Sequence, residues 1–199
     1  DLDGDGDLDI AVGNDMAPNA IYLNDGRGNF SRNGTFGDEY APTRNITLAD
    51  MDEDGDIDIL ITNRGRVNQI CLNNGNASFD EVLSFGSADD STIDVAIADM
   101  NKDGHNDLIL ANRDGQQNYI YLNNGRLDFQ ERIPFGSGKD ETRSVAIADL
   151  DKDGYLDIIT ANIGEANAIY FGDAQNSYAR AVIIDASSNR SYAVELADL

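Results

Sequence analysis

Acidic residues recur in this chain at a spacing that suits the binding of a metal ion. The clearest copy is the nine-residue stretch from Asp149 to Asp157, with aspartate at its first, third, fifth and ninth positions. Glycine at the sixth position, Gly154, permits a sharp turn that brings the carboxylates to one centre. Oxygen ligands without cysteine or histidine among them favour Ca²⁺ over zinc or copper. The stretch therefore predicts a calcium loop.

The stretch occurs four times, and fifteen of its sixteen ligand positions carry aspartate, the exception being Asn101. Turns capped by Asp and Asn side chains explain one such copy without a metal, but not four. An EF-hand is excluded, because its last acid would come at the twelfth position and lead into a helix. The seventh position is expected to offer only its backbone carbonyl, which leaves the side chain of His105 solvated and not catalytic. We predict about four Ca²⁺ sites, with these ligand residues: Asp1, Asp3, Asp5, Asp7 and Asp9; Asp50, Asp52, Asp54, Asp56 and Asp58; Asp99, Asn101, Asp103, His105 and Asp107; Asp149, Asp151, Asp153, Tyr155 and Asp157.

The loops divide the chain into repeats 1–49, 50–98, 99–148 and 149–197, with residues 198–199 starting a fifth copy. Each repeat holds four short apolar segments separated by turn residues, which is the pattern of an all-β repeat. The segments before and after each loop are nearly continuous apolar runs, which predict inner strands buried on both faces. A third segment ends in a turn such as Asn74-Gly75, and a more polar fourth segment predicts an exposed edge strand.

Four antiparallel strands per repeat are typical of a blade of a β-propeller. The repeats resemble the FG-GAP repeat of integrin α-subunit heads and the related bacterial VCBS repeats. The shared pieces are Phe-Gly pairs such as Phe85-Gly86, the approach Val145 to Asp149, and the Asp-rich loop itself. The resemblance spans essentially the whole chain, and it implies blades around a central channel, usually seven, with calcium between the first two strands.

We therefore expect one all-β region over residues 1–199, a β-propeller with four blades of four antiparallel strands that belongs to a larger ring of about seven. The alternative is a four-bladed ring closed on itself, in which a terminal strand from Tyr192 to Leu199 completes the first blade. The single cysteine, Cys71, stands where the other repeats carry tyrosine, so we expect a small core residue there.

Composition narrows the partners and the location. The net charge of −23, from 37 acids against 14 bases, argues against a nucleic-acid partner. No apolar run is long enough to span a membrane. Calcium loops of this kind fill at extracellular calcium concentrations, so a secreted or cell-surface location is expected.

Up-and-down strand order places the calcium loops on one face and the two-to-three and four-to-one loops, such as Ser187 to Arg190, on the other. The second face is the expected ligand surface, because its loops are not committed to metal. Arginines there can hold an acidic sugar or a protein carboxylate. Alternatively, they neutralise neighbouring acids such as Asp38 or Glu141. The candidate ligand-binding residues are Arg44, Arg64, Arg66, Arg113, Arg143 and Tyr192.

The sequence shows no nucleophile and base in a recognisable arrangement, so no catalytic residue is assigned. We predict a calcium-binding, extracellular binding or adhesion module for protein or glycan ligands, with further blades of the same polypeptide as possible neighbours. The alternative is the propeller portion of a carbohydrate-active enzyme such as a polysaccharide lyase, with Tyr and Arg on the ligand face as candidates.

Overall fold

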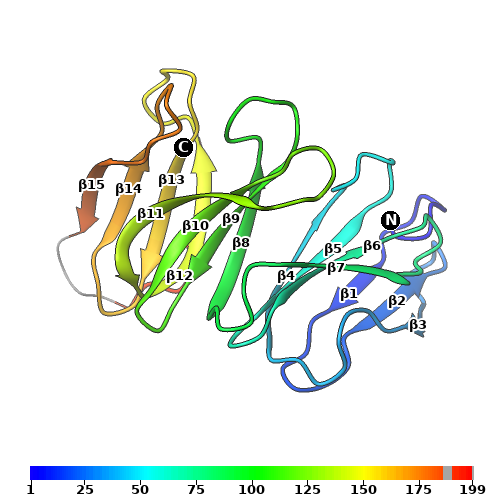
Figure 1. Ribbon diagram of the computed structural model, residues 1–199. Coiled ribbons are helices and arrows are strands. Elements are labelled where there is room, and N and C mark those ends of the chain that lie inside the picture. Colours follow the sequence, from blue (N-terminus) through cyan, green and yellow to red (C-terminus); the bar gives the residue numbers. More distant parts are fainter. Residues whose placement is uncertain (186–189, 199) are drawn as a thin grey trace. The chain divides into compact units, whose positions relative to one another are not determined.

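The computed structural model describes residues 1–185 and 190–198, and strands are its regular elements. These residues contain no helix, which confirms the all-β prediction. The chain divides into two compact units, Asp1–Asp90 and Ser91–Leu199 (Figure 1).

Each unit holds two antiparallel sheets in which strands adjacent in sequence pair with each other. This meander is the strand order of a propeller blade. The first unit contains a three-stranded and a four-stranded sheet: β1 (Ile10–Val12), β2 (Ala20–Asn24) and β3 (Phe30–Gly34); β4 (Thr43–Ala49), β5 (Asp58–Asn63), β6 (Asn68–Leu72) and β7 (Glu81–Phe85). The second unit contains two four-stranded sheets: β8 (Thr92–Ala98), β9 (Asp107–Asn112), β10 (Gln116–Leu122) and β11 (Glu131–Asp140); β12 (Thr142–Ala148), β13 (Asp157–Asn162), β14 (Asn167–Phe171) and β15 (Arg180–Asp185).

The predicted four-stranded blade is confirmed for three sheets, while the first sheet has three strands. The predicted strand from Tyr192 to Leu199 is wrong, because residues 192–198 form no strand. Leu199 lies outside the described residues, as do residues 187–189 of the expected loop Ser187 to Arg190.

The two strands of each repeat that were predicted to be inner strands differ in how deeply they are buried. In β5, β9 and β13 every residue is buried, as their continuous apolar runs predict. The strands before the loops, β4, β8 and β12, are only partly buried, which corrects the prediction for them. The reason is their place at one edge of each sheet, where only one neighbour covers them.

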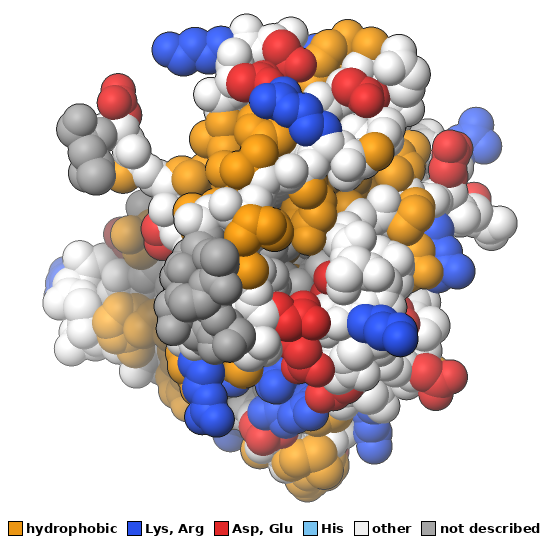
Figure 2. Space-filling view, turned by 90° about the vertical axis from the view of Figure 1, so that its left-hand side faces the viewer, with side chains coloured by type: hydrophobic (Ala, Val, Ile, Leu, Met, Phe, Trp, Pro, Cys, Tyr) orange, Lys and Arg blue, Asp and Glu red, His pale blue; other side chains and the backbone are white. Residues whose placement is uncertain are grey.

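The outer strands occupy the opposite edges, as predicted. Pro134 lies in β11 opposite Tyr119, at an edge where its missing N–H costs no ladder hydrogen bond. β15 departs from the expected polar character, because Val182, Ile183 and Ile184 are 46%, 56% and 54% exposed. Hydrophobic side chains gather among charged ones on the side of the second unit that carries β15 (Figure 2).

The Phe-Gly pairs close the sheets onto the core. Phe36, Phe85 and Phe135 are buried. Gly37 follows with a φ of 66°, and a Cβ there would clash with Cδ1 of Ile61, so the positive φ and the close approach both favour glycine.

In the first and third acidic loops the second residue, Leu2 or Met100, packs into the core of its own unit, whereas Leu150 in the fourth loop is exposed. In the first unit, Leu2 packs in one cluster with Ala77, Phe79 and Cys71, which confirms the prediction of a core cysteine. The carbonyl of Leu2 accepts hydrogen bonds from the amide of Asn73 and the N–H of Ala77, both at 2.8 Å. The first acidic loop is thereby tied to the neighbouring sheet.

Candidate metal centres

The acidic loops adopt the predicted turn in all four copies. The glycine at the sixth position has a φ between 91° and 98°, a region that residues with a side chain rarely enter. Its N–H donates to the first aspartate, at 2.9 to 3.0 Å; the four pairs are Gly6 with Asp1, Gly55 with Asp50, Gly104 with Asp99 and Gly154 with Asp149. The turn therefore folds the first carboxylate back over the loop.

The middle positions stiffen the loop by local side-chain to backbone bonds. In the second loop, Oδ1 of Asp52 accepts from the N–H of Asp54 at 3.3 Å, and Oδ1 of Asp54 accepts from the N–H of Asp56 at 2.9 Å. These are the Asx-type turns considered as the metal-free alternative. Each such bond uses one oxygen of a carboxylate, so the turns and a bound cation are compatible.

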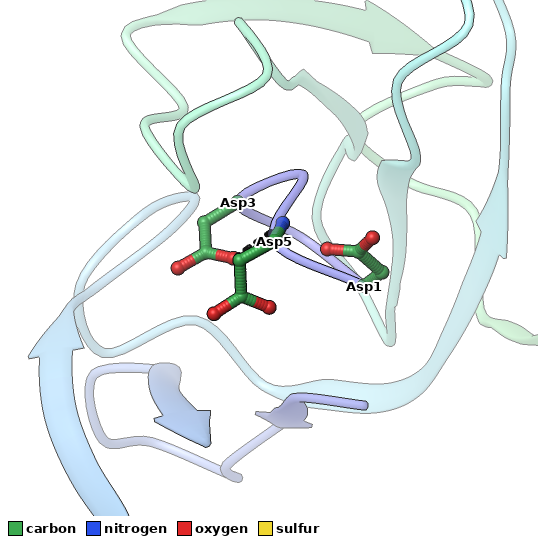
Figure 3. Close-up of side chains that lie close together, drawn as sticks. All are labelled: Asp1, Asp3 and Asp5. Carbon is green, nitrogen blue, oxygen red and sulfur yellow. Dashed lines mark hydrogen bonds between the residues drawn. The ribbon is translucent and has the colours of Figure 1, made fainter. Parts of the chain in front are cut away.

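Three of the four loops gather carboxylate oxygens within 4.8 Å of one another: Asp1, Asp3 and Asp5; Asp50, Asp52 and Asp58; Asp149, Asp151 and Asp157. Figure 3 shows the side chains of the first group lying together inside their turn. In the second group, burial and the neighbouring charge of Asp54 raise the pKa of Asp52 above its ordinary value. Like charges are thus crowded in a way that a cation would relieve.

The donor set suits a hard divalent cation. Oδ1 of Asp149 is buried and has no hydrogen-bond partner among the described residues, although Oδ2 of the same carboxylate is bonded to Gly154. A buried acceptor without a donor is costly unless a ligand satisfies it. This buried acceptor and the oxygen-only ligand set together fit Ca²⁺ or a cation of similar chemistry.

The ninth position has a role that sequence reasoning missed. In every copy its carboxylate accepts hydrogen bonds from two backbone N–H groups. One belongs to the second residue of the loop, and the other belongs to a residue where the third strand of the repeat ends. In the second loop, Asp58 binds Met51 at 2.8 Å and Asn73 at 2.8 Å. Burial raises the pKa of Asp58 to about 6 and, in the third loop, the pKa of Asp107 to about 6. This aspartate therefore clamps loop to sheet.

The third loop differs from the others, as its asparagine suggests. The amide of Asn101 donates to Oδ2 of Asp103 at 2.9 Å, so this side chain holds a neighbouring acid in place. The three clusters found among the described residues do not include this loop.

The seventh position packs against the turn between the third and fourth strands. A Cβ on Gly75 would lie 2.6 Å from Oδ2 of Asp56, and one on Gly125 would lie 2.5 Å from Nε2 of His105. His105 is half-buried beneath this turn, so the expectation of a solvated side chain is wrong. The glycine of the turn is needed for this packing, a signal that the Asn-Gly pairs already carried.

The fourth loop carries its own counter-charge. Nη1 of Arg180 lies 2.8 Å from Oδ2 of Asp151, and its guanidinium lies 3.8 Å above the ring of Phe171. Sequence spacing gave no indication of this contact, because it depends on the pairing of β14 with β15.

On the predicted ligand face, asparagine pairs organise the loops between the second and third strands. In the second repeat, the N–H of Asn63 donates to Asn68 at 2.8 Å, and the amide of Asn63 donates to the carbonyl of Val67 at 2.9 Å. The corresponding asparagines do the same in the other repeats: Asn14 with Asn19, Asn112 with Asn118 and Asn162 with Asn167. These asparagines therefore use their backbone N–H and side-chain NH₂ groups inside the loop, while Oδ1 of Asn112 and Oδ1 of Asn162 have no partner among the described residues.

The candidate ligand residues fall in both units and behave differently. In the first unit, Arg44 pairs with Asp15 at 3.0 Å, and Arg64 and Arg66 are exposed. The alternative reading as a neutralising residue is thus correct for Arg44, with Asp15 as its partner and not Asp38.

In the second unit, Arg113 pairs with Glu141 at 3.3 Å, as the neutralising alternative predicted. Arg143 lies 5.1 Å from the ring of the exposed Tyr192, and its buried Nε has no hydrogen-bond partner among the described residues. Arg143 and Tyr192 are thus the two candidates that the structure brings together.

A serine and aspartate pair after the Phe-Gly motif was also missed. The N–H and hydroxyl of Ser87 donate to Asp90 at 2.7 and 2.8 Å, and those of Ser137 donate to Asp140 at 2.8 Å each. The shared spacing, Phe-Gly-Ser-x-x-Asp, could have revealed it.

Two solved structures share this fold. A lectin from Agrocybe aegerita, described as recognising non-reducing terminal N-acetylglucosamine, matches with a TM-score of 0.62 and 21% identity over 95% of this chain and 51% of the lectin. An exo-β-1,3-galactanase from Phanerochaete chrysosporium, solved with β-1,3-galactotriose, matches with a TM-score of 0.54 and 9% identity over 84% of this chain and 44% of the enzyme. The chain spans about half the length of these structures.

The remaining comparisons concern membrane spans and sequence relatives. Among the described residues, no helix is long and apolar enough to cross a membrane. No curated protein matches the sequence. The profile of the FG-GAP-like repeat matches three times, over residues 1–61, 50–110 and 99–160. The chain belongs to the FG-GAP-like repeat family, with the β-propeller type of blade that its sheets display.

Proposed function

We propose that the protein is an extracellular, calcium-stabilised β-propeller module that binds protein or glycan ligands. The observation that carries the calcium part is the buried Oδ1 of Asp149, which lies in a converging carboxylate cluster and has no donor in the described part of the chain. The cations would be held by the aspartates at the first, third, fifth and ninth loop positions, with Asn101 in the third loop. Bound calcium would supply structural cross-linking between loop and sheet and no chemistry of its own.

The chain's own residues would transmit that stabilisation. The ninth aspartate, such as Asp58, joins the loop to the third strand. The Leu2 carbonyl joins the first loop to the neighbouring sheet through Asn73 and Ala77. Ordering of a loop would therefore stabilise the sheets around it.

Removal of calcium tests this part. At a free Ca²⁺ concentration of about 10 to 100 times the dissociation constant, each site adds about 1.4 to 2.7 kcal/mol to the free energy of unfolding. A protein of ordinary stability has about 5 to 15 kcal/mol in total. EDTA should therefore lower the melting temperature markedly, and readdition of Ca²⁺ should restore it. An unchanged melting curve after metal removal, verified by elemental analysis, contradicts the proposal.

The extracellular location is part of the same proposal. Exposed loops of aspartates on a chain of net charge −23 are expected to bind calcium at the millimolar concentrations found outside cells. A measured affinity tight enough for cytosolic calcium would contradict that location.

The ligand part of the proposal concerns the face opposite the acidic loops. Arg143 is the strongest candidate for an anionic group, because its Nε lacks a hydrogen-bond partner among the residues that the structure describes and Tyr192 offers an exposed ring beside it. Binding of a panel of acidic glycans and matrix proteins to wild type and Arg143→Ala, by surface plasmon resonance, tests it. Loss of binding at unchanged melting temperature supports the site. Loss of stability with binding intact would make Arg143 structural.

A further inference from the structure

The second unit contains a groove that neither the acidic loops nor the ligand face uses. It runs between the outer strand β11 and the turn that precedes β15, and its volume of about 470 Å³ lies within the range of small-ligand sites, about 300 to 1,000 Å³. Its lining residues are Gln117, Ile133, Pro134, Phe135, Gly136, Gln175, Asn176, Ser177, Tyr178 and Ala179.

The chemistry of this lining is unusual for the chain. A quarter of the residues are charged and the net charge is −23, yet the groove is lined by none of Asp, Glu, Lys or Arg. Its polar side chains are the carboxamides of Gln117, Gln175 and Asn176, which offer both donors and acceptors, and the hydroxyl groups of Ser177 and Tyr178. Apolar surface from Ile133 and Pro134 lies beside them. Such a surface suits a ligand that is neutral, rich in hydroxyl groups and apolar on one face.

In the first unit a side-chain hydrogen bond bridges the same place. There, the amide of Asn33 in β3 donates to the carbonyl of Ala77 at 3.3 Å, across the corresponding crevice. Arg132 stands at the position of Asn33 in the second unit, counted from the Phe-Gly pair. Its guanidinium lies 4.4 Å from the ring of Tyr119 in its own sheet and so leaves the groove open.

The backbone conformation at Gln117 and Asn176 does not depend on their carboxamide groups. Asn176 has a φ of 53°, and Ala77, at the same position of the second sheet's turn, has a φ of 52°. The carbonyl of Gln117 accepts an asparagine amide at 2.8 Å, as does that of Val67 in the second repeat at 2.9 Å. A methyl group and an isopropyl group are therefore compatible with the same backbone at these two positions.

Gln117 is nevertheless held in one orientation at the groove wall. Its amide nitrogen donates to the carbonyls of Asn118 and Phe135, which turns its oxygen away from those two carbonyls. Among the described residues, the carboxamides of Gln175 and Asn176 make no side-chain hydrogen bond. Polar groups positioned in this way have their hydrogen-bonding capacity available for a ligand.

We propose that this groove binds a neutral saccharide. Hydroxyl groups of a sugar would pair with the three carboxamides and with Ser177, while the C–H face of the ring would cover Ile133 and Pro134. The proposal goes beyond the acidic ligand considered for Arg143, since the groove lacks any group to neutralise a carboxylate. It rests on the proposed glycan-binding role for its ligand class, but not on calcium.

The test uses saturation-transfer NMR and calorimetry on the whole chain in saturating Ca²⁺. The probes are N-acetylglucosamine, galactose, glucose and β-1,3-linked galactobiose, with glucuronate as the charged control. At least one neutral probe should bind, and Gln117→Val combined with Asn176→Ala should weaken its binding about tenfold or more, the equivalent of one to two hydrogen bonds. Failure of all neutral probes to bind the wild type overturns the proposal.

Matched variants keep the result interpretable. Both substitutions introduce residues that the second repeat already carries, so the melting temperature should stay within a few degrees of wild type. Asn76→Ala, at the position in the first unit that corresponds to Gln175, should leave binding unchanged, whereas Gln175→Ala should weaken it. Ala179→Tyr, at an exposed residue of the lining, should block the groove without touching the core.

The outcomes separate this site from the proposed calcium role and from Arg143. Neutral binding that survives both Gln117→Val/Asn176→Ala and Ala179→Tyr overturns the groove, whatever EDTA does to stability. Neutral binding lost in Arg143→Ala and kept in the groove variants also overturns it. An effect confined to the groove variants supports it even if the melting temperature is insensitive to calcium.

Discussion

The second and fourth acidic loops each gather the carboxylates of their first, third and ninth positions into a cluster. The two loops differ in the residue of the outer strand that faces this cluster. Asp50, Asp52 and Asp58 correspond to Asp149, Asp151 and Asp157. The outer strands begin with Glu81 and Arg180, which pair with equivalent positions, Leu72 and Phe171. Glu81 lines a small cavity of about 340 Å³ with Asp52 and Asp54, whereas Arg180 forms an ion pair with Asp151.

The difference shows that the loop motif alone does not set the electrostatic balance of a site. In the second loop, burial raises the pKa of Asp52, and the neighbouring charge of Asp54 raises it further. In the fourth loop, the guanidinium already compensates part of the charge. A cation should therefore relieve more repulsion in the second loop than in the fourth.

The buried clamp offers the strongest way to break the second loop. Asp58→Asn keeps the shape but places an NH₂ group where a carboxylate oxygen now accepts the N–H of Met51 or Asn73. One buried donor is then left unsatisfied, which costs about 1 to 3 kcal/mol beyond any loss of calcium affinity. Urea unfolding in EDTA should show this loss even without metal.

Asp54→Asn is the control, because among the described residues the carboxylate of Asp54 bonds only within the loop. It should change unfolding in calcium but scarcely in EDTA. Equal losses for both variants in EDTA would contradict the clamp.

The single cysteine reports on the same unit. Burial raises the pKa of Cys71 to about 12, and the side chain lies in the core of the first unit, beside the clamp of the second loop. Alkylation by iodoacetamide at pH 8 therefore requires the unit to open, since the thiolate is the reactive form. EDTA empties both loops of the first unit, so it should accelerate labelling by at least about 10- to 100-fold, the factor that one calcium site contributes.

The rate in EDTA should fall back when Ca²⁺ is restored. Asp151→Asn, in the other unit, serves as the control and should leave the labelling rate in calcium nearly unchanged. A rate that is insensitive to EDTA would show that the second loop does not hold the first unit closed.

Much of this architecture could be predicted because its signals are local. Apolar runs next to the loops correspond to β5, β9 and β13, and Gly154 and its equivalents mark the turns. The same reasoning failed for the segment Val194 to Ala197, whose pattern matches Val145 to Ala148. β12 pairs with the strand that follows its loop, β13, and residues 194–197 have no such partner among the described residues.

Contacts between segments far apart in the chain could not be predicted from the sequence. The ion pair of Arg180 with Asp151 requires the register of β14 with β15, and the bridge from Asn33 to Ala77 requires two sheets to lie side by side. The lack of a partner for Oδ1 of Asp149 among the described residues depends on burial, which spacing does not specify. The candidate calcium ligands were thus accessible from their pattern, whereas their unequal surroundings were not.

Exchanging the outer-strand residue should shift the fourth loop toward the behaviour of the second. Arg180→Glu removes the ion pair and adds the acid that Glu81 provides. Because Arg180 is 64% exposed, the pair is worth at most about 1 kcal/mol, so affinity for the cation should rise up to about fivefold. Terbium luminescence sensitised by Tyr155, at the seventh position of the fourth loop only, provides the measurement.

Arg180→Lys keeps the charge and should leave the terbium affinity close to wild type, while Asp149→Asn should remove the signal. A signal that is as strong in Asp149→Asn as in wild type would show that another tyrosine is the sensitiser. Weaker binding in Arg180→Glu than in wild type would contradict the role of Arg180 as a competing counter-charge.

The third loop should give the smallest response. Asn101 lowers its ligand charge by one, and its amide holds Asp103 through a 2.9 Å hydrogen bond, an attraction that a carboxylate would turn into repulsion. Asn101→Asp should therefore tighten calcium binding only about threefold, because the added ligand charge is offset by crowding with Asp103. The backbone amide of Gly104, which donates to Asp99, reports this loop in an NMR titration. Its midpoint should fall in the variant while those of Gly55 and Gly154 stay fixed. An unchanged midpoint for Gly104 would remove the third ligand position from the site.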